Sequence, residues 1–169
     1  LAVTCHELAS ISERRINQVL SPHWGGQNAF LANEEGLESG LMILQYVSAA
    51  LLAELHLLAN PTTTSNVPVS MEKEDHVSMG WGAARKLRQL VANTARVLAV
   101  ELAAASRALD FRAPLKPGAS TGAVHQVIRL HVDPPATDRY LAPELAAVEA
   151  LVNDGAIVEA AESVIGALA

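Results

Sequence analysis

The sequence predicts an all-α protein built as a bundle of long helices. Alanine and leucine, two strong helix formers, supply nearly a third of the 169 residues. Apolar residues recur at spacings of three, four and seven, as they do along one face of a helix. The alternating pattern that would predict a strand is not found in any segment.

Composition and charge narrow the possible functions. An apolar fraction of 50% rules out intrinsic disorder, and a net charge of −6 argues against a surface for nucleic acid or an anionic membrane, either of which needs a basic patch. We expect neither nucleic acid nor a membrane as a partner. The charged fraction of 18% leaves little polar surface for a helical protein, which predicts a homo-oligomer or a part of a larger assembly. The single cysteine, Cys5, excludes an internal disulfide framework and favours a reducing, cytoplasmic location.

The first third of the chain predicts two helices and a loop. The first helix is expected over His6–Leu20, and a loop over Ser21–Gly36 follows, with Trp24 and Phe30 as anchors. Gly36–Ala59 is the most apolar stretch and approaches the length of a membrane span. Four polar residues interrupt it, so we expect a helix buried on most sides inside a bundle. They are Gln45, Ser48, Glu54 and His56.

A polar loop and a very long helix come next. Asn60–Ser70 is bounded by prolines and has no periodicity, and Ser70 is placed to cap a helix that continues to Leu109. Three acids would then occupy the first turn, where the helix dipole favours negative charge. They are Glu72, Glu74 and Asp75. A helix of this length spans about 50 Å and must pack on other helices.

The rest of the chain predicts a smaller helical unit after a linker at Phe111–Ser120. Its helices are expected over Thr121–His131, Pro143–Asn153 and Ala156–Leu168, the last two joined as a hairpin at Asp154-Gly155. We therefore divide the chain into a central long-helix segment, residues 1–112, and a small helical segment, residues 113–169. The first contains the candidate active-site loop, residues 60–76.

Chemistry-bearing residues are concentrated at Met71–Gly80. The six histidines lack the dense spacing of metal ligands, and no metal site is expected. In Met71–Gly80, by contrast, three acids and a histidine crowd together, either as solvated charges at a helix start or as site residues. Glu74, Asp75 and His76 are consecutive and point about 100° apart on a helix, so any site must borrow groups from elsewhere.

Residues 74–80, with the sequence EDHVSMG, resemble a signature of the histidine ammonia-lyases and the related aromatic amino-acid lyases and aminomutases. Four further segments resemble family motifs in the family's order. They are ISERR at 11–15, NAFL at 28–31, GLESGLMI at 36–43 and ANP at 59–61, similar to the family's ISERR, PAFL, GLNSGFMI and AHP. The resemblance runs through most of the chain.

The resemblance implies a helical homotetramer that eliminates ammonia from an aromatic amino acid, with L-histidine to urocanate as the favoured case. The family uses a methylidene-imidazolone (MIO) electrophile and builds each active site from more than one subunit. Glu74 aligns with a carboxylate near the substrate's amine or ring, and its proposed roles are catalysis and substrate binding. Met42 aligns with a residue lining the side-chain pocket; core packing is its alternative role.

The chain resembles only the last third of such an enzyme. The Ala-Ser-Gly tripeptide that forms MIO has no counterpart here, since Ala119-Ser120-Thr121 follows the signature and ends in Thr. Glu72-Lys73 stands where the family usually has Asn-Gln, which leaves the substrate open. The alternatives are a tyrosine or phenylalanine lyase or aminomutase, and a non-catalytic helical oligomerisation module derived from the family.

We therefore predict that the isolated 169-residue chain has neither lyase activity nor MIO absorbance, because no electrophile can form within it. An assay of urocanate release from L-histidine by the purified chain checks this. Measurable turnover would contradict the prediction.

Overall fold

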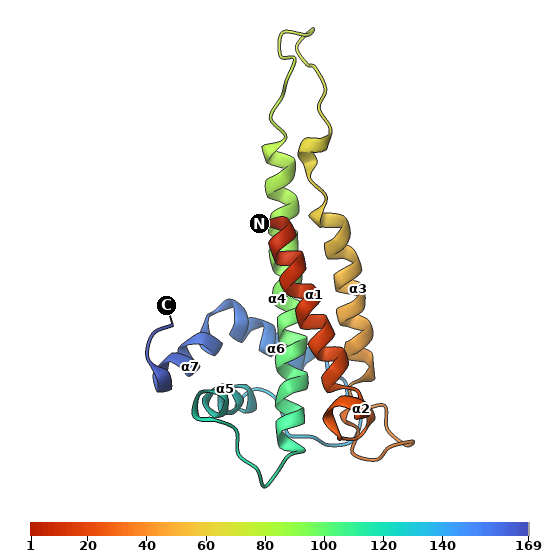
Figure 1. The fold of residues 1–169 in the computed structure, drawn as a ribbon, viewed down its shortest axis with the longest axis vertical. Helices are drawn as coiled ribbons and strands as arrows, with labels where there is room; N and C mark the ends of the chain where they lie inside the picture. Colours follow the sequence, from red (N-terminus) through yellow and green to blue (C-terminus); the bar gives the residue numbers. More distant parts are fainter. Residues whose placement is uncertain (169) are drawn as a thin grey trace.

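A computed structural model describes residues 1–168 and confirms the all-α class (Figure 1). The described residues form seven α-helices and two short 3₁₀ helices, and contain no β-sheet. In chain order these are α1 (Ala2–Val19), α2 (Pro22–Gly25), η1 (Ala29–Leu31), α3 (Met42–Ala59), η2 (Thr62–Thr64), α4 (Gly80–Asp110), α5 (Ala119–Arg129), α6 (Ala142–Asn153) and α7 (Ala156–Ile165).

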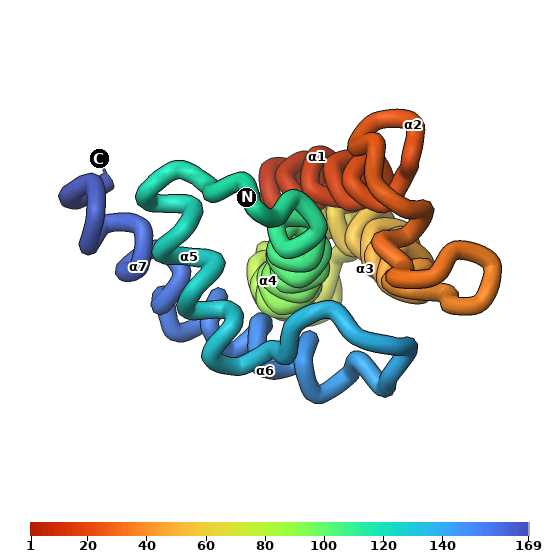
Figure 2. The backbone as a smooth tube through the Cα atoms, turned by 90° about the horizontal axis from the view of Figure 1, so that it is seen from below, coloured from red at the N-terminus to blue at the C-terminus, as the bar shows by residue number. Residues whose placement is uncertain are grey.

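Three long helices form the bundle that the periodicity predicts. In the end-on view, α1 and α3 lie side by side against α4 (Figure 2). Their shared core holds fully buried aliphatic side chains from each helix, because each of the three turns one apolar face inward. The largest are Ile16, Leu44, Leu55, Leu90, Val97 and Val100. The 31 residues of α4 span about 46 Å, so this helix is the axis of the molecule.

A second core lies on the other side of α4, where α5, α6 and α7 pack (Figures 1 and 2). Its buried residues are Ala99, Ile128, Val132, Val148 and Leu151. Gly155 links α6 to α7 with a φ of 79°, a left-handed conformation that glycine adopts without strain. The predicted turn at Asp154-Gly155 is therefore confirmed, but the two helices do not pack as a hairpin, because α7 packs mainly against α5 rather than α6.

Polar residues of the ISERR segment join α1 to α4. The hydroxyl of Ser12, which is fully buried, donates to a carboxylate oxygen of Glu101 at 2.5 Å. Arg15 donates to the same carboxylate through Nε at 2.5 Å and Nη2 at 3.0 Å. This hydrogen bond raises the pKa of the Arg15 guanidinium above its ordinary value. The shared carboxylate therefore satisfies both α1 side chains where the helices meet.

The predicted start of the long helix, after a cap at Ser70, is wrong, because α4 begins nine residues later, at Gly80 with Met79 as its N-cap. Ser70, Met71 and Glu72 have φ between 54° and 65°, which no right-handed helix allows. They form a turn whose flanks pair through the backbone of Val69 and Glu74. The first turn of α4 consequently contains no acid, and Glu74 does not lie at a helix N-terminus.

The apolar stretch at Gly36–Ala59 also differs from expectation. Its helix, α3, begins at Met42, because Gly36 and Gly40 adopt φ of 85° and 56°. Burial on most sides is wrong for this chain, since only Leu44, Ser48 and Leu55 of α3 are buried. Five exposed residues recur every three or four positions and form what we call the α3 stripe. They are Ile43, Tyr46, Ala50, Ala53 and Leu57.

Among the described helices, α3 is also the one long and apolar enough to cross a membrane by length and composition. A helix at the core of a soluble protein meets the same criterion, so this property is weak support for a membrane span.

Two smaller expectations have mixed outcomes. The first helix begins at Ala2 rather than His6, so the predicted start is four residues late. Trp24 does not anchor the following loop, because 74% of its surface is exposed. Phe30 does, since it packs against the main core.

Candidate functional site

The segment singled out by sequence forms a projecting loop, residues 65–79, beyond the ends of the bundle helices (Figure 1). Two pairs of contacts close it. Val69 and Glu74 exchange backbone hydrogen bonds at 2.9 and 3.3 Å near the tip. Nearer the base, the amide side chain of Asn66 accepts from the backbone N–H of Val77 at 3.0 Å and donates to its carbonyl. The loop thus has a defined hairpin-like shape.

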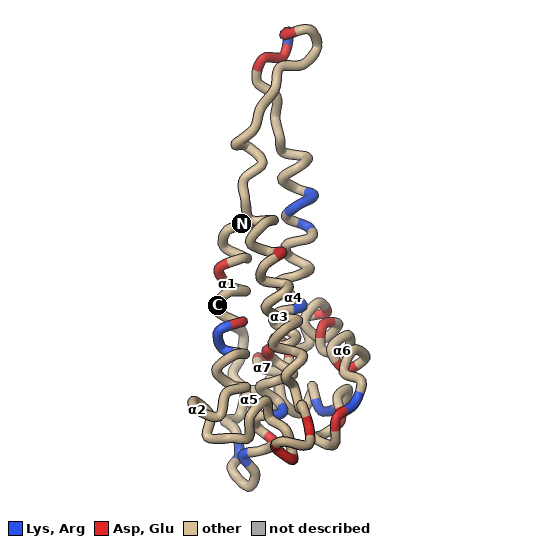
Figure 3. The backbone as a smooth tube through the Cα atoms, turned by 90° about the vertical axis from the view of Figure 1, so that its right-hand side faces the viewer, with Lys and Arg blue, Asp and Glu red and all other residues tan. Residues whose placement is uncertain are grey.

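The tip presents its charged side chains to solvent. Glu74, Asp75 and His76 are all exposed, and acidic positions mark the tip in Figure 3. Lys73 contributes one cation among them. Because the backbone of Glu74 is hydrogen-bonded to that of Val69, the position from which its side chain projects is fixed.

Met42, the second predicted site residue, lies far from this loop. It is the first residue of α3 and is half-buried, whereas the loop follows the other end of α3 (Figure 1). The 18 residues of α3 span about 27 Å. The structure therefore does not bring Met42 and Glu74 of one chain together.

The backbone that leads into Met42 is tightly constrained. Gly40 adopts a φ of 56°, and a Cβ placed there would lie 2.6 Å from the carbonyl oxygen of Phe30 and 2.8 Å from the nitrogen of Ala32. The Phe30 carbonyl also accepts from the N–H of Leu41 at 2.8 Å. Phe30 and Leu31 both have a φ of 54°, which is unusual for residues with side chains. Local strain of this kind persists only where neighbouring contacts enforce it.

A carboxylate from the small helical segment reaches the same turn. Asp138 lies in the connection between α5 and α6, about a hundred residues along the chain from its partners. Its two oxygens accept from the backbone N–H groups of Ser39 and Gly40 at 2.7 and 2.9 Å.

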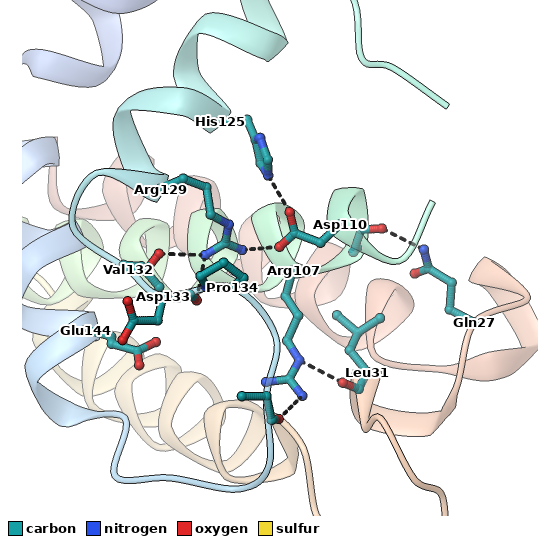
Figure 4. A network of polar contacts seen from close by, with 12 residues as sticks. Gln27, Leu31, Arg107, Asp110, His125, Arg129, Val132, Asp133, Pro134 and Glu144 are labelled. Atoms are coloured by element: carbon teal, nitrogen blue, oxygen red, sulfur yellow. Dashed lines mark hydrogen bonds and ion pairs between the residues drawn. The ribbon is translucent and has the colours of Figure 1, made fainter. Parts of the chain in front are cut away.

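A buried arginine of α4 contacts both the segment around Leu31 and the segment that carries Asp138 (Figure 4). Arg107 is 6% exposed, and its Nε donates to the Leu31 carbonyl at 2.8 Å. Its Nη2 donates to the carbonyl of Ala136 at 3.5 Å. Burial, and then the nearby charge of Arg139, lower the pKa of the Arg107 guanidinium, whereas Glu38 and Asp138 act in the opposite direction.

Figure 4 also shows contacts that join Asp110, at the end of α4, to α5. Asp110, the last residue of α4, lies 2.9 Å from His125 Nε2 and accepts from Arg129 Nη2 at 2.6 Å. Arg129 also donates to the carbonyls of Val132 and Asp133, at 3.2 and 3.1 Å. Patterns in the sequence did not predict this network. One signal was available, because an acid at a helix C-terminus opposes the helix dipole and requires a cation.

Metal binding receives no support from the described residues, among which no group of three or more His, Cys, Asp or Glu side chains could hold an ion. His6 on α1 and His56 on α3 lie beside each other, with ring centroids 5.5 Å apart, but no third such side chain joins them.

The helical bundle and its projecting EDHVSMG loop are consistent with the family that sequence comparison identifies. Residues 1–130 match the model for aromatic amino acid lyases, and the chain belongs to this family. The similar curated proteins include histidine ammonia-lyases from Streptomyces avermitilis, 47% identical over 100% of this chain, and Streptomyces coelicolor, 51% identical over 99%.

Solved structures show the same fold. Histidine ammonia-lyase from Trypanosoma cruzi is 34% identical over 96% of this chain, with a TM-score of 0.93. A tyrosine aminomutase from Streptomyces globisporus is 32% identical over 94%, with a TM-score of 0.90. The chain spans about a third of the length of these relatives: 33% of each Streptomyces lyase and 32% of the Trypanosoma cruzi chain.

The constrained turn before Met42 yields a stability prediction. Gly40→Ala should reduce the free energy of unfolding by about 3 kcal/mol or more, because a left-handed alanine costs about 1–2 kcal/mol and its Cβ also meets backbone atoms. Gly36→Ala is the control, since Gly36 has a φ of 85° but no atom within 4 Å of the added Cβ. It should cost about 1–2 kcal/mol. Urea denaturation measures both losses, and equal losses would contradict the close approach at Gly40.

Proposed function

We propose that the chain is the C-terminal segment of a histidine ammonia-lyase, which converts L-histidine to urocanate and ammonia in the complete protein. The observation that carries this proposal is the 47–51% identity to two histidine ammonia-lyases over essentially the whole chain. The EDHVSMG segment and Met42 agree with it. Assaying the complete protein with histidine, tyrosine and phenylalanine tests the substrate and separates a lyase from a non-catalytic module.

The electrophile of this reaction is not formed by the residues of this chain. The family's MIO group arises from Ala-Ser-Gly, and that tripeptide does not occur among the 169 residues. In the complete protein MIO makes the substrate's amino group a better leaving group. What this chain contributes is substrate binding, charge and assembly.

Glu74 and Met42 have distinct proposed roles. The Glu74 carboxylate, exposed at the loop tip, accepts a hydrogen bond or proton from the ammonium or imidazole of the substrate. Met42, half-buried at the start of α3, packs its flexible thioether side chain on the substrate's ring. The role of Glu74 requires a side chain that projects from the surface of its own chain. The role of Met42 requires a side chain held in the wall of a pocket.

The separation of the two residues favours a shared site. Because α3 places about 27 Å between Met42 and the projecting loop, one active site would take Met42 from one copy and Glu74 from another. A cytoplasmic homotetramer, as the family resemblance implies, supplies such pairs. We further propose that residues 1–112 form the tetramer's central helices and residues 113–169 a small helical unit beside them.

The α3 stripe provides a surface for this assembly. Its five apolar residues follow the heptad spacing by which one helix packs against another, and all five are exposed in the single chain. We propose that copies associate partly through this stripe, with the apolar area removed from water as the driving force.

The isolated chain should therefore self-associate, and Ala53→Glu on the α3 stripe should reduce its mass toward that of a monomer. A charge in the middle of an apolar helix interface loses its hydration without a partner. Ala150→Glu on α6 is the matched control, because Ala150 is also an exposed helical alanine but lies outside the stripe. Light scattering measures the mass, and a monomeric wild-type chain at high concentration would contradict the prediction.

Replacing Glu74 in the complete protein tests its role in the chemistry. Glu74→Gln preserves shape and removes the charge, so turnover should fall by roughly 100-fold or more, on the scale of acid–base and electrostatic contributions. The free energy of unfolding should change by less than about 0.5 kcal/mol, because the side chain is exposed.

Asp75→Asn is the control for Glu74, since Asp75 is the adjacent acid on the same exposed loop. Turnover and melting temperature are measured for both variants. Near-normal turnover of Glu74→Gln would remove Glu74 from the site, and equal losses in both variants would indicate a general effect of loop charge.

A further inference from the structure

We propose that Asp138 is a positioning residue for the substrate pocket: its carboxylate fixes the Ser39-Gly40 turn and thereby places Met42 against the substrate's side chain. This inference rests on the proposed function, in which Met42 lines the pocket. It adds a residue from the small helical segment, outside the motifs identified in the sequence.

The contact geometry supports the placement. Each carboxylate oxygen of Asp138 accepts from a different backbone N–H, Ser39 at 2.7 Å and Gly40 at 2.9 Å. A carboxylate held at two points restricts rotation as well as distance, which a single hydrogen bond does not. Ser39 in turn accepts from the N–H of Met42 through its carbonyl, at 3.1 Å. Asp138 is therefore connected to Met42 through one residue and two hydrogen bonds.

The opposite side of the turn is also fixed. Gly40 packs closely against the backbone of Phe30 and Ala32, in a conformation without room for a Cβ. The turn is thus held between the Phe30–Ala32 backbone and the Asp138 carboxylate. No side chain caps the N-terminus of α3, so these two contacts set where the helix begins.

Arg107 connects the two sides. It donates to the carbonyl of Leu31 on one side and to that of Ala136, two residues before Asp138, on the other. A buried guanidinium needs such acceptors, which makes the arrangement costly to disturb. The start of α3 is consequently built from four separate segments of the chain and forms a rigid base for a pocket residue.

The test uses the complete protein with Asp138→Ala and Asp138→Asn; the second retains one acceptor and the side-chain volume if the first fails to fold. Two readouts are expected to change. Amide hydrogen exchange at Ser39 and Gly40 should accelerate roughly tenfold or more as their acceptor is lost. KM for histidine should rise roughly tenfold, with kcat within about threefold of wild type, as expected when a binding contact is misplaced.

A double-mutant cycle with Met42 separates positioning from general destabilisation. In a Met42→Ala background, Asp138→Asn should change KM little further, because its effect acts through Met42. Glu101→Gln is the matched control: it breaks a comparable carboxylate contact between α1 and α4. It should leave exchange at Ser39 and Gly40 and the KM at wild-type values, whatever it does to the melting temperature.

Unchanged amide exchange in both Asp138 variants would overturn the contact itself. Faster exchange with a wild-type KM, or additive effects of Asp138→Asn and Met42→Ala, would overturn the positioning role. If the wild-type complete protein deaminates none of the three aromatic amino acids, the proposed function fails, and with it the role in the pocket, while the exchange measurement still decides whether Asp138 fixes the turn.

Discussion

The arrangement of this chain depends on one buried cation, the guanidinium of Arg107 in the last turn of α4. A charge removed from water must be surrounded by oxygen atoms, and here the nearest are main-chain carbonyls of Leu31 and Ala136. One lies between α1 and α3, the other between α5 and α6. Because Arg107 donates to both carbonyls, it fixes the position of the long-helix bundle relative to the small helical segment.

The helical fold was predictable because it depends on local patterns that repeat. Leu90, Val97 and Val100 recur along one face of α4, and such periodicity reports burial directly. The turn at Gly155 was equally predictable, because glycine between two helical patterns favours the left-handed conformation that ends a helix. Where a helix begins is less well encoded. The acids near Glu74 have the pattern of a helix start, yet backbone pairing of Glu74 with Val69 closes that segment into a hairpin-like turn.

The candidate site was predictable only as a set of residues. Glu74 and Met42 were identified through family resemblance, and the helix predicted over Gly36–Ala59 already places a helix length between them. Asp138 and Arg107 were not identified, because their partners are main-chain groups. The N–H donor of Ser39 is 99 residues from Asp138, the carbonyl acceptor of Leu31 is 76 residues from Arg107, and main-chain groups leave no pattern in a sequence. Long-range contacts of a side chain with the main chain therefore need a structure to be seen.

The projecting loop has a thermodynamic consequence for assembly. A flexible segment of this length would lose backbone conformational entropy on docking, at a cost of about 1–2 kcal/mol per residue that becomes ordered. Because Asn66 holds Val77 and Val69 pairs with Glu74, much of that loss has already occurred in the free chain. The loop can then associate as a preformed part, and its affinity for a receiving surface is reduced less by ordering.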